Sequence, residues 1–256
     1  MPDDSPFDLA GRRALVTGGS RGIGAATARL LARRGADVIV TYRSRMSDAE
    51  VVVAAIHAAG RRGEAHAVEL ADRAGVDALF ERVAGSWGGL DILVGNAGIW
   101  PVEEAAVSDL TDARWSRTIA ENVDGMFYST RAALRIMADG GRVVLVSSTA
   151  GQRGEAMHAD YAASKGAMIS FVKSVAVEVA PRDITVNSVA PGWVDTEMCA
   201  EPFAGGGRER IARGIPLGRI ATPDDIAAPI VFLCTSGARH VTGEILNVNG
   251  GSVLCG

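Results

Sequence analysis

Apolar and polar residues follow two recurring patterns along the chain. Short runs rich in β-branched residues predict buried strands, and stretches with apolar residues every three or four positions predict helices. The predicted strands span 13–17, 37–42, 64–70, 91–94, 142–147, 185–189 and 244–248. The predicted helices span 23–34, 49–59, 76–87, 111–138, 160–180 and 223–234. This alternation predicts an α/β fold, a doubly wound parallel sheet of about seven strands with helices on both faces.

The length of the chain favours a single domain over residues 1–256, because this many residues can enclose one sizeable core. The glycine cluster Gly205–Gly207 could be a linker between domains. The sequence that follows it is short and ends in a predicted strand, so we interpret about 195–215 as a mobile loop over a site.

Composition limits the possible partners. The net charge of −4 leaves no basic surface for nucleic acid. No apolar stretch reaches the roughly 18 residues of a membrane span, and residues 1–9 are acidic and lack the pattern of a signal peptide. The three cysteines, Cys199, Cys234 and Cys255, fit neither a disulfide framework nor a metal site. We therefore expect a cytoplasmic protein without a metal.

Glycines gather in the loop between the first predicted strand and helix, which reads TGGSRGIG over residues 17–24. Glycines let a backbone turn sharply and approach a pyrophosphate, which then faces the N-terminus of the helix. A tight connection without a ligand is the alternative, but the strand–loop–helix context favours phosphate binding. The contacts predicted here are Gly18, Ser20, Arg21, Gly22, Ile23 and Gly24.

The end of the second predicted strand indicates which dinucleotide binds. An acid at this position would hydrogen-bond the ribose 2′-hydroxyl of NAD, whereas this chain has Tyr42 and Arg43, followed by Ser44 and Arg45. Together with Arg21, these arginines suit a 2′-phosphate. They could instead be solvated surface residues. The missing acid favours NADPH over NADH, with Tyr42 and Arg43 as contacts.

A tyrosine and a lysine are the candidates for proton transfer. Tyr161 and Lys165 lie four residues apart on one face of a predicted helix, and the chain has only one other lysine. A surface pair would be the alternative. Ser148 follows the fifth predicted strand, at the end where open α/β sheets form their sites.

Taken together, these motifs resemble the short-chain dehydrogenase/reductases of the classical type. The resemblance is carried by TGGSRGIG, Asn96-Ala97-Gly98, Asn122, Ser148, YAASK over 161–165 and Pro191-Gly192. The segment from Ile215 to Gly251 resembles the 3-oxoacyl-acyl-carrier-protein reductase branch. The resemblance implies a single-domain Rossmann fold.

The resemblance also implies a role for each site residue. Tyr161 would donate the proton during reduction, and Lys165 would lower its pKa from about 10 and hold the nicotinamide ribose. Ser148 would hydrogen-bond the substrate oxygen. Asn122 would position a water beside Lys165, although a purely structural role is the alternative. The further cofactor contacts that it implies are Asn96, Ala97, Gly98, Tyr161, Lys165, Pro191, Gly192, Val194 and Thr196.

Two positions depart from the family pattern. Gly95 stands where an asparagine is usual, and Glu69-Leu70 stands where an aspartate or asparagine often lies near the adenine. Both positions are on the cofactor side, where they could weaken cofactor affinity.

The expected activity is NADPH-dependent reduction of a ketone, 3-oxoacyl-like or related, to a secondary alcohol. An alcohol or sugar dehydrogenase that works oxidatively and a non-catalytic NADP(H) sensor are the alternatives. The presence of both Tyr161 and Lys165 favours an enzyme. By resemblance, a small or carrier-bound carbonyl would contact Trp100, Gln152–His158, Trp193 and 195–215.

The predicted helix 160–180 favours self-association, because only four of its residues are charged. A helix that is apolar nearly all round is usually buried, and a two-fold partner could cover it. We expect Phe171 to face that partner, with Met126, Phe127 and Met137 as possible neighbours. The resemblance implies a homotetramer, with residues 244–256 at another interface.

Overall fold

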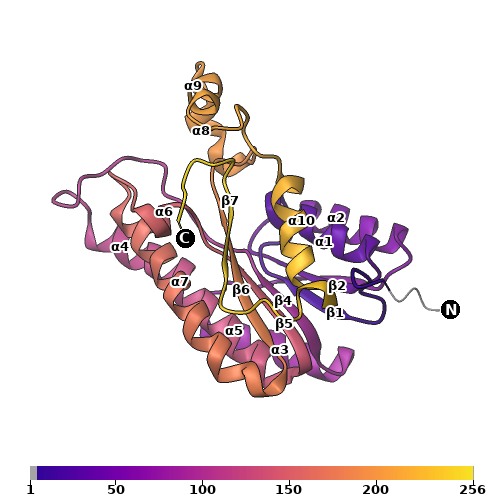
Figure 1. The fold of residues 1–256 in the computed structure, drawn as a ribbon. Coiled ribbons are helices and arrows are strands. Elements are labelled where there is room, and N and C mark those ends of the chain that lie inside the picture. Colours follow the sequence, from indigo (N-terminus) through magenta and orange to yellow (C-terminus); the bar gives the residue numbers. More distant parts are fainter. Residues whose placement is uncertain (1–4, 256) are drawn as a thin grey trace.

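The computed structural model describes residues 5–255, so residues 1–4 and 256 lie outside it, including part of the acidic segment 1–9 and the last residue of 244–256. Seven parallel strands form one sheet in the order β3-β2-β1-β4-β5-β6-β7, which confirms the predicted fold class (Figure 1). The strands are β1 Arg13–Val16, β2 Asp37–Tyr42, β3 Gly63–Ala67, β4 Leu90–Gly95, β5 Met137–Val146, β6 Thr185–Pro191 and β7 Ile245–Val248.

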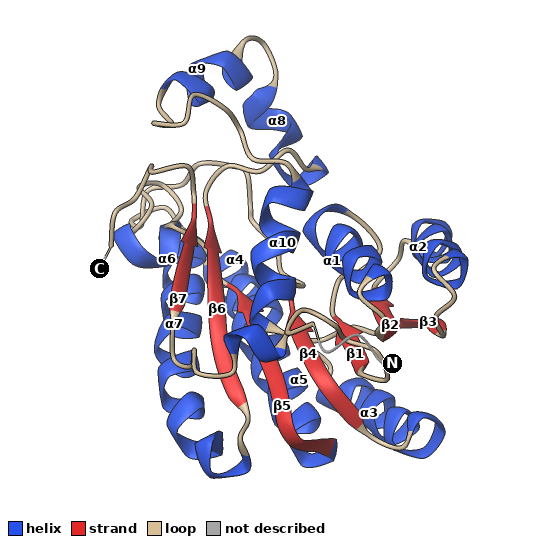
Figure 2. Ribbon diagram, turned by 45° about the vertical axis from the view of Figure 1, so that its right-hand side comes forward, coloured by secondary structure: helices blue, strands red, loops and turns tan. Residues whose placement is uncertain are grey.

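Helices cover both faces of this sheet (Figure 2). The helices are α1 Gly22–Arg33, α2 Met46–Ala58, α3 Arg73–Trp87, α4 Asp112–Ile119, α5 Gly125–Ile136, α6 Ala150–Arg153, α7 Ala159–Val179, α8 Ala200–Phe203, α9 Gly207–Arg213 and α10 Pro223–Leu233. Successive strand residues point to opposite faces. Val16 therefore packs with α1, α2 and α10, and its neighbour Leu15 packs with α3, α5 and α7.

The predicted helix 111–138 is interrupted and ends earlier than expected. A π-helical turn, Ala120–Asp124, separates α4 from α5, and Met137 already belongs to β5, where it pairs with Leu90. The helix ends at Ile136 because Met137 already has an extended backbone, with φ −75° and ψ 134°. The third strand ends at Ala67 rather than at residue 70, and Leu70 instead contacts Gly125 of α5.

Two short helices, α8 and α9, lie within the predicted mobile loop 195–215, and they project beyond the carboxyl ends of the strands (Figure 1). Gly205 and Gly206 join these helices with positive φ angles, which glycine adopts readily. Arg208 pairs with Asp195 and lies over the ring of Phe203. The mobility of this segment stays a prediction. No helix among residues 5–255 is long and apolar enough to cross a membrane.

Helix α7 is less apolar on its outer face than the sequence indicated. Met168 is buried, and Phe171 is half-buried with its ring edge against Phe127. Met126 and Met137 are also buried, so neither can contact a partner, whereas Phe127 is exposed. The outward stripe of α7 consists of small and apolar residues, Ala163, Ala167, Ser170, Ser174 and Val177, and the exposed charged residues Lys173 and Glu178 flank it.

An ion pair joins the beginnings of two central strands. Asp91 of β4 accepts hydrogen bonds from the backbone N of Arg13 at 2.9 Å and from its Nε at 2.7 Å. Burial alone would raise the pKa of Asp91, but these bonds outweigh it and hold the pKa below 3.8. The pair therefore ties β1 to β4 beneath the site.

We predict that Asp91→Ala lowers the free energy of unfolding at pH 7 by about 1–2 kcal/mol, because Arg13 loses charged hydrogen bonds. Since the pKa of Asp91 is lower in the folded protein, the unfolded chain binds more protons in acid. The contribution is therefore present above pH 3.8 and disappears as the pH falls through the folded value.

Urea unfolding from pH 7 to pH 3 measures this effect. Asp139→Ala is the control, because Asp139 also pairs with an arginine, Arg182, but its side chain is 77% exposed. It should change the unfolding free energy by less than about 0.5 kcal/mol. An equal effect of the two substitutions would contradict the role of Asp91.

Candidate active site

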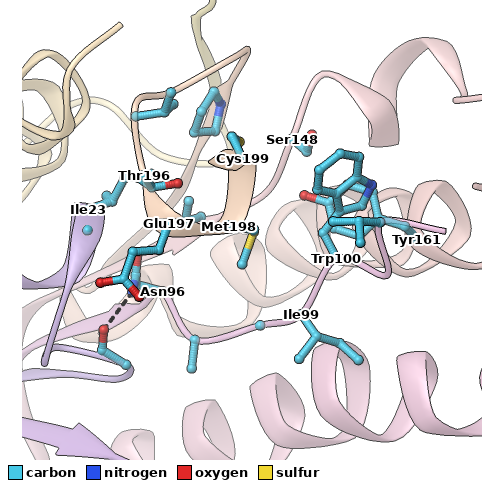
Figure 3. Close-up of a pocket in the computed structure, with 18 of the residues that line it drawn as sticks. Ile23, Asn96, Ile99, Trp100, Ser148, Tyr161, Thr196, Glu197, Met198 and Cys199 are labelled. Atoms are coloured by element: carbon cyan, nitrogen blue, oxygen red, sulfur yellow. Dashed lines mark hydrogen bonds between the residues drawn. The ribbon is translucent and has the colours of Figure 1, made fainter. Parts of the chain in front are cut away.

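A cavity of about 890 Å³ opens at the carboxyl ends of the strands. Its walls come from the glycine loop, the segments that follow β2, β4, β5 and β6, and the first turns of α7. Ligands bind at this edge of open α/β sheets, because the loops that leave neighbouring strands diverge there. The fold thus brings together residues that are far apart in the sequence (Figure 3).

Most of the predicted site residues line this cavity. They are Gly18, Ser20, Arg21, Gly22, Ile23, Tyr42, Arg43, Asn96, Ala97, Gly98, Ser148, Tyr161, Lys165, Pro191, Gly192, Val194 and Thr196. Gly24 and Asn122 are not part of its lining. Each of these two residues supports the site from behind.

The glycine loop has the geometry of an anion cradle. Gly18 and Gly22 adopt positive φ angles of 62° and 54°, and a Cβ on Gly24 would lie 2.3 Å from the carbonyl oxygen of Gly18. Gly24 therefore lets α1 pack closely against the loop. No side chain caps the N-terminus of α1, and its first turn holds no acid. Its backbone N–H groups suit the pyrophosphate of a dinucleotide.

Ser148 and Tyr161 line the end of the cavity away from the glycine loop (Figure 3). Lys165 lines the cavity as well. The Lys165 Nζ donates to the carbonyl oxygen of Val146 at 2.8 Å and lies 5.8 Å from the centre of the Tyr161 ring. Helix α7 supplies both the tyrosine and the lysine, and the segment after β5 supplies the serine.

The expected decrease in the pKa of Tyr161 is not found. Burial raises the pKa of Tyr161 to about 12, and the side chain of Ser148 offsets this only in part. Lys165 does not contribute to the shift, because its ammonium group is directed to Val146 rather than to the phenol oxygen. Burial also lowers the pKa of Lys165 to about 8. The predicted decrease in the pKa of Tyr161 rested on the positive charge of Lys165 and did not include the desolvation of the buried phenol.

Asn122 lies in the π-helical turn and is completely buried. Its side-chain amide donates to the carbonyl oxygen of Ile99 and to Ser164 Oγ, each at 3.0 Å, and accepts from the Ile99 N–H at 2.8 Å. Ser164 in turn donates to the carbonyl oxygen of Tyr161 at 2.7 Å. The side chain thus has a structural role, and its suggested water contact stays a prediction.

The arginines expected to bind a 2′-phosphate are paired with carboxylates. Glu197 bonds Arg21 and also Arg45, the latter at 3.1 Å. Arg43 bonds Glu121 at 2.7 Å and lies 3.6 Å from Glu69. Glu121 and Glu197 were not predicted, because nothing in their local sequence pattern places them beside the second strand.

The substrate side of the cavity differs in part from the expectation. Trp100, Arg153, Glu155, His158 and Trp193 line it as expected. Gln152 does not, because its amide group donates to Asn247 at 2.7 Å.

A buried ion pair behind Tyr161 was also missed. Asp160 is completely buried and accepts from Arg114 at 3.1 Å and from Thr118 at 2.8 Å. Burial alone would raise the pKa of Asp160, but these hydrogen bonds keep it below 3.8. Arg114 also donates to the carbonyl oxygen of Glu103 at 2.6 Å. It therefore connects the wall of the cavity to the helix that carries Tyr161.

Comparisons with known proteins agree with this geometry. A family model described as enoyl-(acyl carrier protein) reductase matches residues 18–252. The 3-oxoacyl-acyl-carrier-protein reductase of Vibrio cholerae is 39% identical over 250 residues, which are 97% of this chain and 100% of the relative. The trihydroxynaphthalene reductase of Pestalotiopsis fici is 37% identical over 258 residues, covering 96% of this chain and 91% of the relative.

Solved structures give the same result. A short-chain dehydrogenase from Burkholderia cenocepacia in complex with NADP superposes with a TM-score of 0.90 at 40% identity, covering 95% of this chain and 98% of that one. A short-chain dehydrogenase/reductase from Serratia marcescens has a TM-score of 0.90 at 37% identity, covering 95% and 98%. Likeness of this extent, in both sequence and fold, confirms that the chain belongs to the short-chain dehydrogenase/reductase family of NAD(P)-dependent oxidoreductases.

Proposed function

We propose that this protein reduces a ketone to a secondary alcohol and uses NADPH as the hydride donor. The observation that carries the proposal is that Ser148, Tyr161 and Lys165 line the same cavity as the glycine loop. When bound, NADPH supplies a hydride to the carbonyl carbon. Tyr161 supplies the proton to the carbonyl oxygen, and Ser148 hydrogen-bonds that oxygen while its negative charge develops.

Burial keeps Tyr161 in its protonated form at neutral pH, because it raises the pKa to about 12, so the phenol has the proton that the reduction of a ketone requires. An alcohol or sugar dehydrogenase would use the same groups in the reverse direction and is the alternative. A sensor without catalysis would not need Tyr161, Ser148 and Lys165 together.

The preference for NADPH rests on Arg21, Arg43 and Arg45, which lie along the cofactor side of the cavity. The arginines themselves are about half exposed, as is Glu197, whereas Glu121 is only 17% exposed. A phosphate is a stronger, bidentate acceptor and could take the place of these carboxylates on the exposed guanidinium groups. The likeness to the Burkholderia cenocepacia protein in complex with NADP supports the same assignment.

The likeness to relatives leaves the carbonyl substrate open. One relative is named for 3-oxoacyl groups on a carrier protein and another for a trihydroxynaphthalene, while the family model is described by enoyl reduction. Ser148 and Tyr161 can both hydrogen-bond a substrate oxygen atom, which favours the reduction of a carbonyl group over that of a carbon–carbon double bond.

We also infer a homo-oligomer, with a tetramer as the expected assembly. The support is the outward stripe of α7 together with the exposed ring of Phe127, which a symmetric partner would cover. The half-buried position of Phe171 moves the expected contact from that residue to Ala167, in the middle of the stripe.

We predict that Tyr161→Phe lowers kcat by about 10²–10⁴-fold while the binding of NADPH changes little, because only the proton donor is removed. Stopped-flow turnover and fluorescence titration of NADPH measure the two effects. Tyr128→Phe, which removes a hydroxyl from α5 outside the cavity lining, should retain full activity. A Tyr161→Phe enzyme with half of the wild-type activity would rule out this assignment.

Removing both Arg21 and Arg43 should raise the KM for NADPH about tenfold or more and leave the KM for NADH nearly unchanged, since only NADPH has the 2′-phosphate. Steady-state kinetics with both cofactors measures the difference. Arg117→Ala is the control, because Arg117 pairs with Glu121 at 3.3 Å but does not line the cavity. An equal rise in the KM for NADPH and for NADH would contradict the proposal that Arg21 and Arg43 bind the 2′-phosphate.

Ala167→Glu should convert the oligomer to smaller species, because a charge in the middle of the stripe would be buried without a partner. Sedimentation velocity at micromolar concentration measures the change. Val51→Glu on α2, where Val51 is exposed, should leave the assembly intact. A wild-type protein that sediments as a monomer would refute the inferred interface.

A further inference from the structure

Aromatic rings gather on the substrate side of the cavity. The ring of Trp100 lies 5.3 Å from His158, 6.4 Å from Tyr161 and 5.7 Å from Trp193, measured between centroids. Phe203 of α8 extends the group, 5.9 Å from Trp193. Only 5% of the chain is Phe, Trp or Tyr, so this concentration around one side chain is a specific feature.

These rings come from segments that the fold brings together. Trp100 follows β4, His158 precedes α7 and Trp193 follows β6, so they form a continuous wall beside the carboxyl ends of the central strands. We call Trp100, His158 and Trp193 the aromatic wall. The two tryptophans are half-buried and line the cavity, and Figure 3 shows Trp100 beside Tyr161, with Met198 on the opposite side.

The position of the carbonyl determines what touches this wall. Tyr161 and Ser148 fix the carbonyl oxygen, so the atoms within two or three bonds of the carbonyl carbon lie nearest to Trp100. A flexible acyl chain there would gain apolar contact only. A flat ring there would also make offset or edge-to-face contacts, which aromatic pairs form at 4.5–7 Å between centroids.

Charge around this end of the cavity favours an uncharged substrate. Glu103, Glu104 and Glu201 line the cavity together with Arg210, and Arg153 is paired with Glu155 at 2.6 Å, so carboxylates outnumber arginines. A substrate that carries phosphate groups would meet this excess of carboxylates, which is unfavourable.

We propose that the aromatic wall selects uncharged, planar aromatic ketones, such as those with two fused rings, over saturated or acyclic ketones. The inference rests on the proposed function, because ketone reduction at Tyr161 is its readout. It names the substrate class of the same site.

Two bicyclic ketones with the same carbon skeleton provide the test. In 2-tetralone the ring next to the ketone ring is aromatic and flat, whereas in 2-decalone it is saturated and puckered. We expect the wild-type kcat/KM with NADPH to be about tenfold higher for 2-tetralone, the gain from about one aromatic pair. Acetoacetyl-CoA is a third substrate, which is acyclic and anionic.

Variants at the wall separate ring contact from general apolar contact. Trp100→Leu should lower kcat/KM for 2-tetralone about tenfold and change that for 2-decalone less than about twofold. Trp100→Phe keeps an aromatic ring and should therefore retain most of the preference for 2-tetralone over 2-decalone. Trp115→Leu, at an exposed tryptophan outside the cavity lining, should leave both values unchanged. Titration with NADPH verifies that each variant is folded.

The outcomes separate this inference from the proposed function. If the wild-type enzyme reduces the two bicyclic ketones equally well, or prefers acetoacetyl-CoA, the aromatic wall does not select the substrate, although ketone reduction stands. Equal losses for both ketones in Trp100→Leu would overturn the inference in the same way. If the protein binds NADPH but reduces none of the three ketones, the proposed function itself fails.

Discussion

The buried amide of Asn122 connects the parts of the molecule on which the site depends. It forms hydrogen bonds with the backbone of Ile99 and with the side chain of Ser164. Ser164 in turn donates a hydrogen bond to the backbone of Tyr161. The segment after β4, which carries Trp100, is thereby fixed to the helix that carries Tyr161. The π-helical turn marks this point, as such turns frequently do at functional sites. A polar network in which each bond has its partner is rigid, so it can hold the reacting groups in register.

Different interactions dominate at the two ends of the cavity: ion pairs at one end and desolvation at the other. At the cofactor end, arginines and glutamates at the surface form a set of exchangeable ion pairs, which an anion can enter at modest cost. At the catalytic end, burial dominates and raises the pKa of Tyr161 while it lowers that of Lys165. Both shifts favour the uncharged form of each group, as desolvation requires. Ion pairs therefore dominate where the cofactor is proposed to bind, whereas desolvation dominates around Tyr161 and Lys165.

The sequence patterns predict those features that local chemistry determines. Strand and helix order, the glycine loop, and Tyr161 with Lys165 follow from periodicity and short spacings, because their geometry is set within a few residues. Features set by tertiary contact were missed: the pairing of Glu197 with Arg21 spans 176 positions, and the bond between Arg114 and Asp160 spans 46. The predicted shift in the pKa of Tyr161 had the wrong direction for the same reason, since burial is a property of the whole fold. Helix α7 was read as uniformly apolar, although Met168 and Phe171 pack inward.

The strand order has a consequence for how the chain is made. Strands β1 to β3 form one side of the sheet from residues 13–67, and they carry the glycine loop. Helices α1 and α2 pack against these strands, and Ile226 and Ile230 of α10 lie in the same core as Leu31 of α1. During translation, about 150 residues must therefore leave the ribosome after β3 before α10 can complete the core beside α1. Until then the half exposes apolar surface, so the earliest part of the protein to be synthesised depends on one of the last.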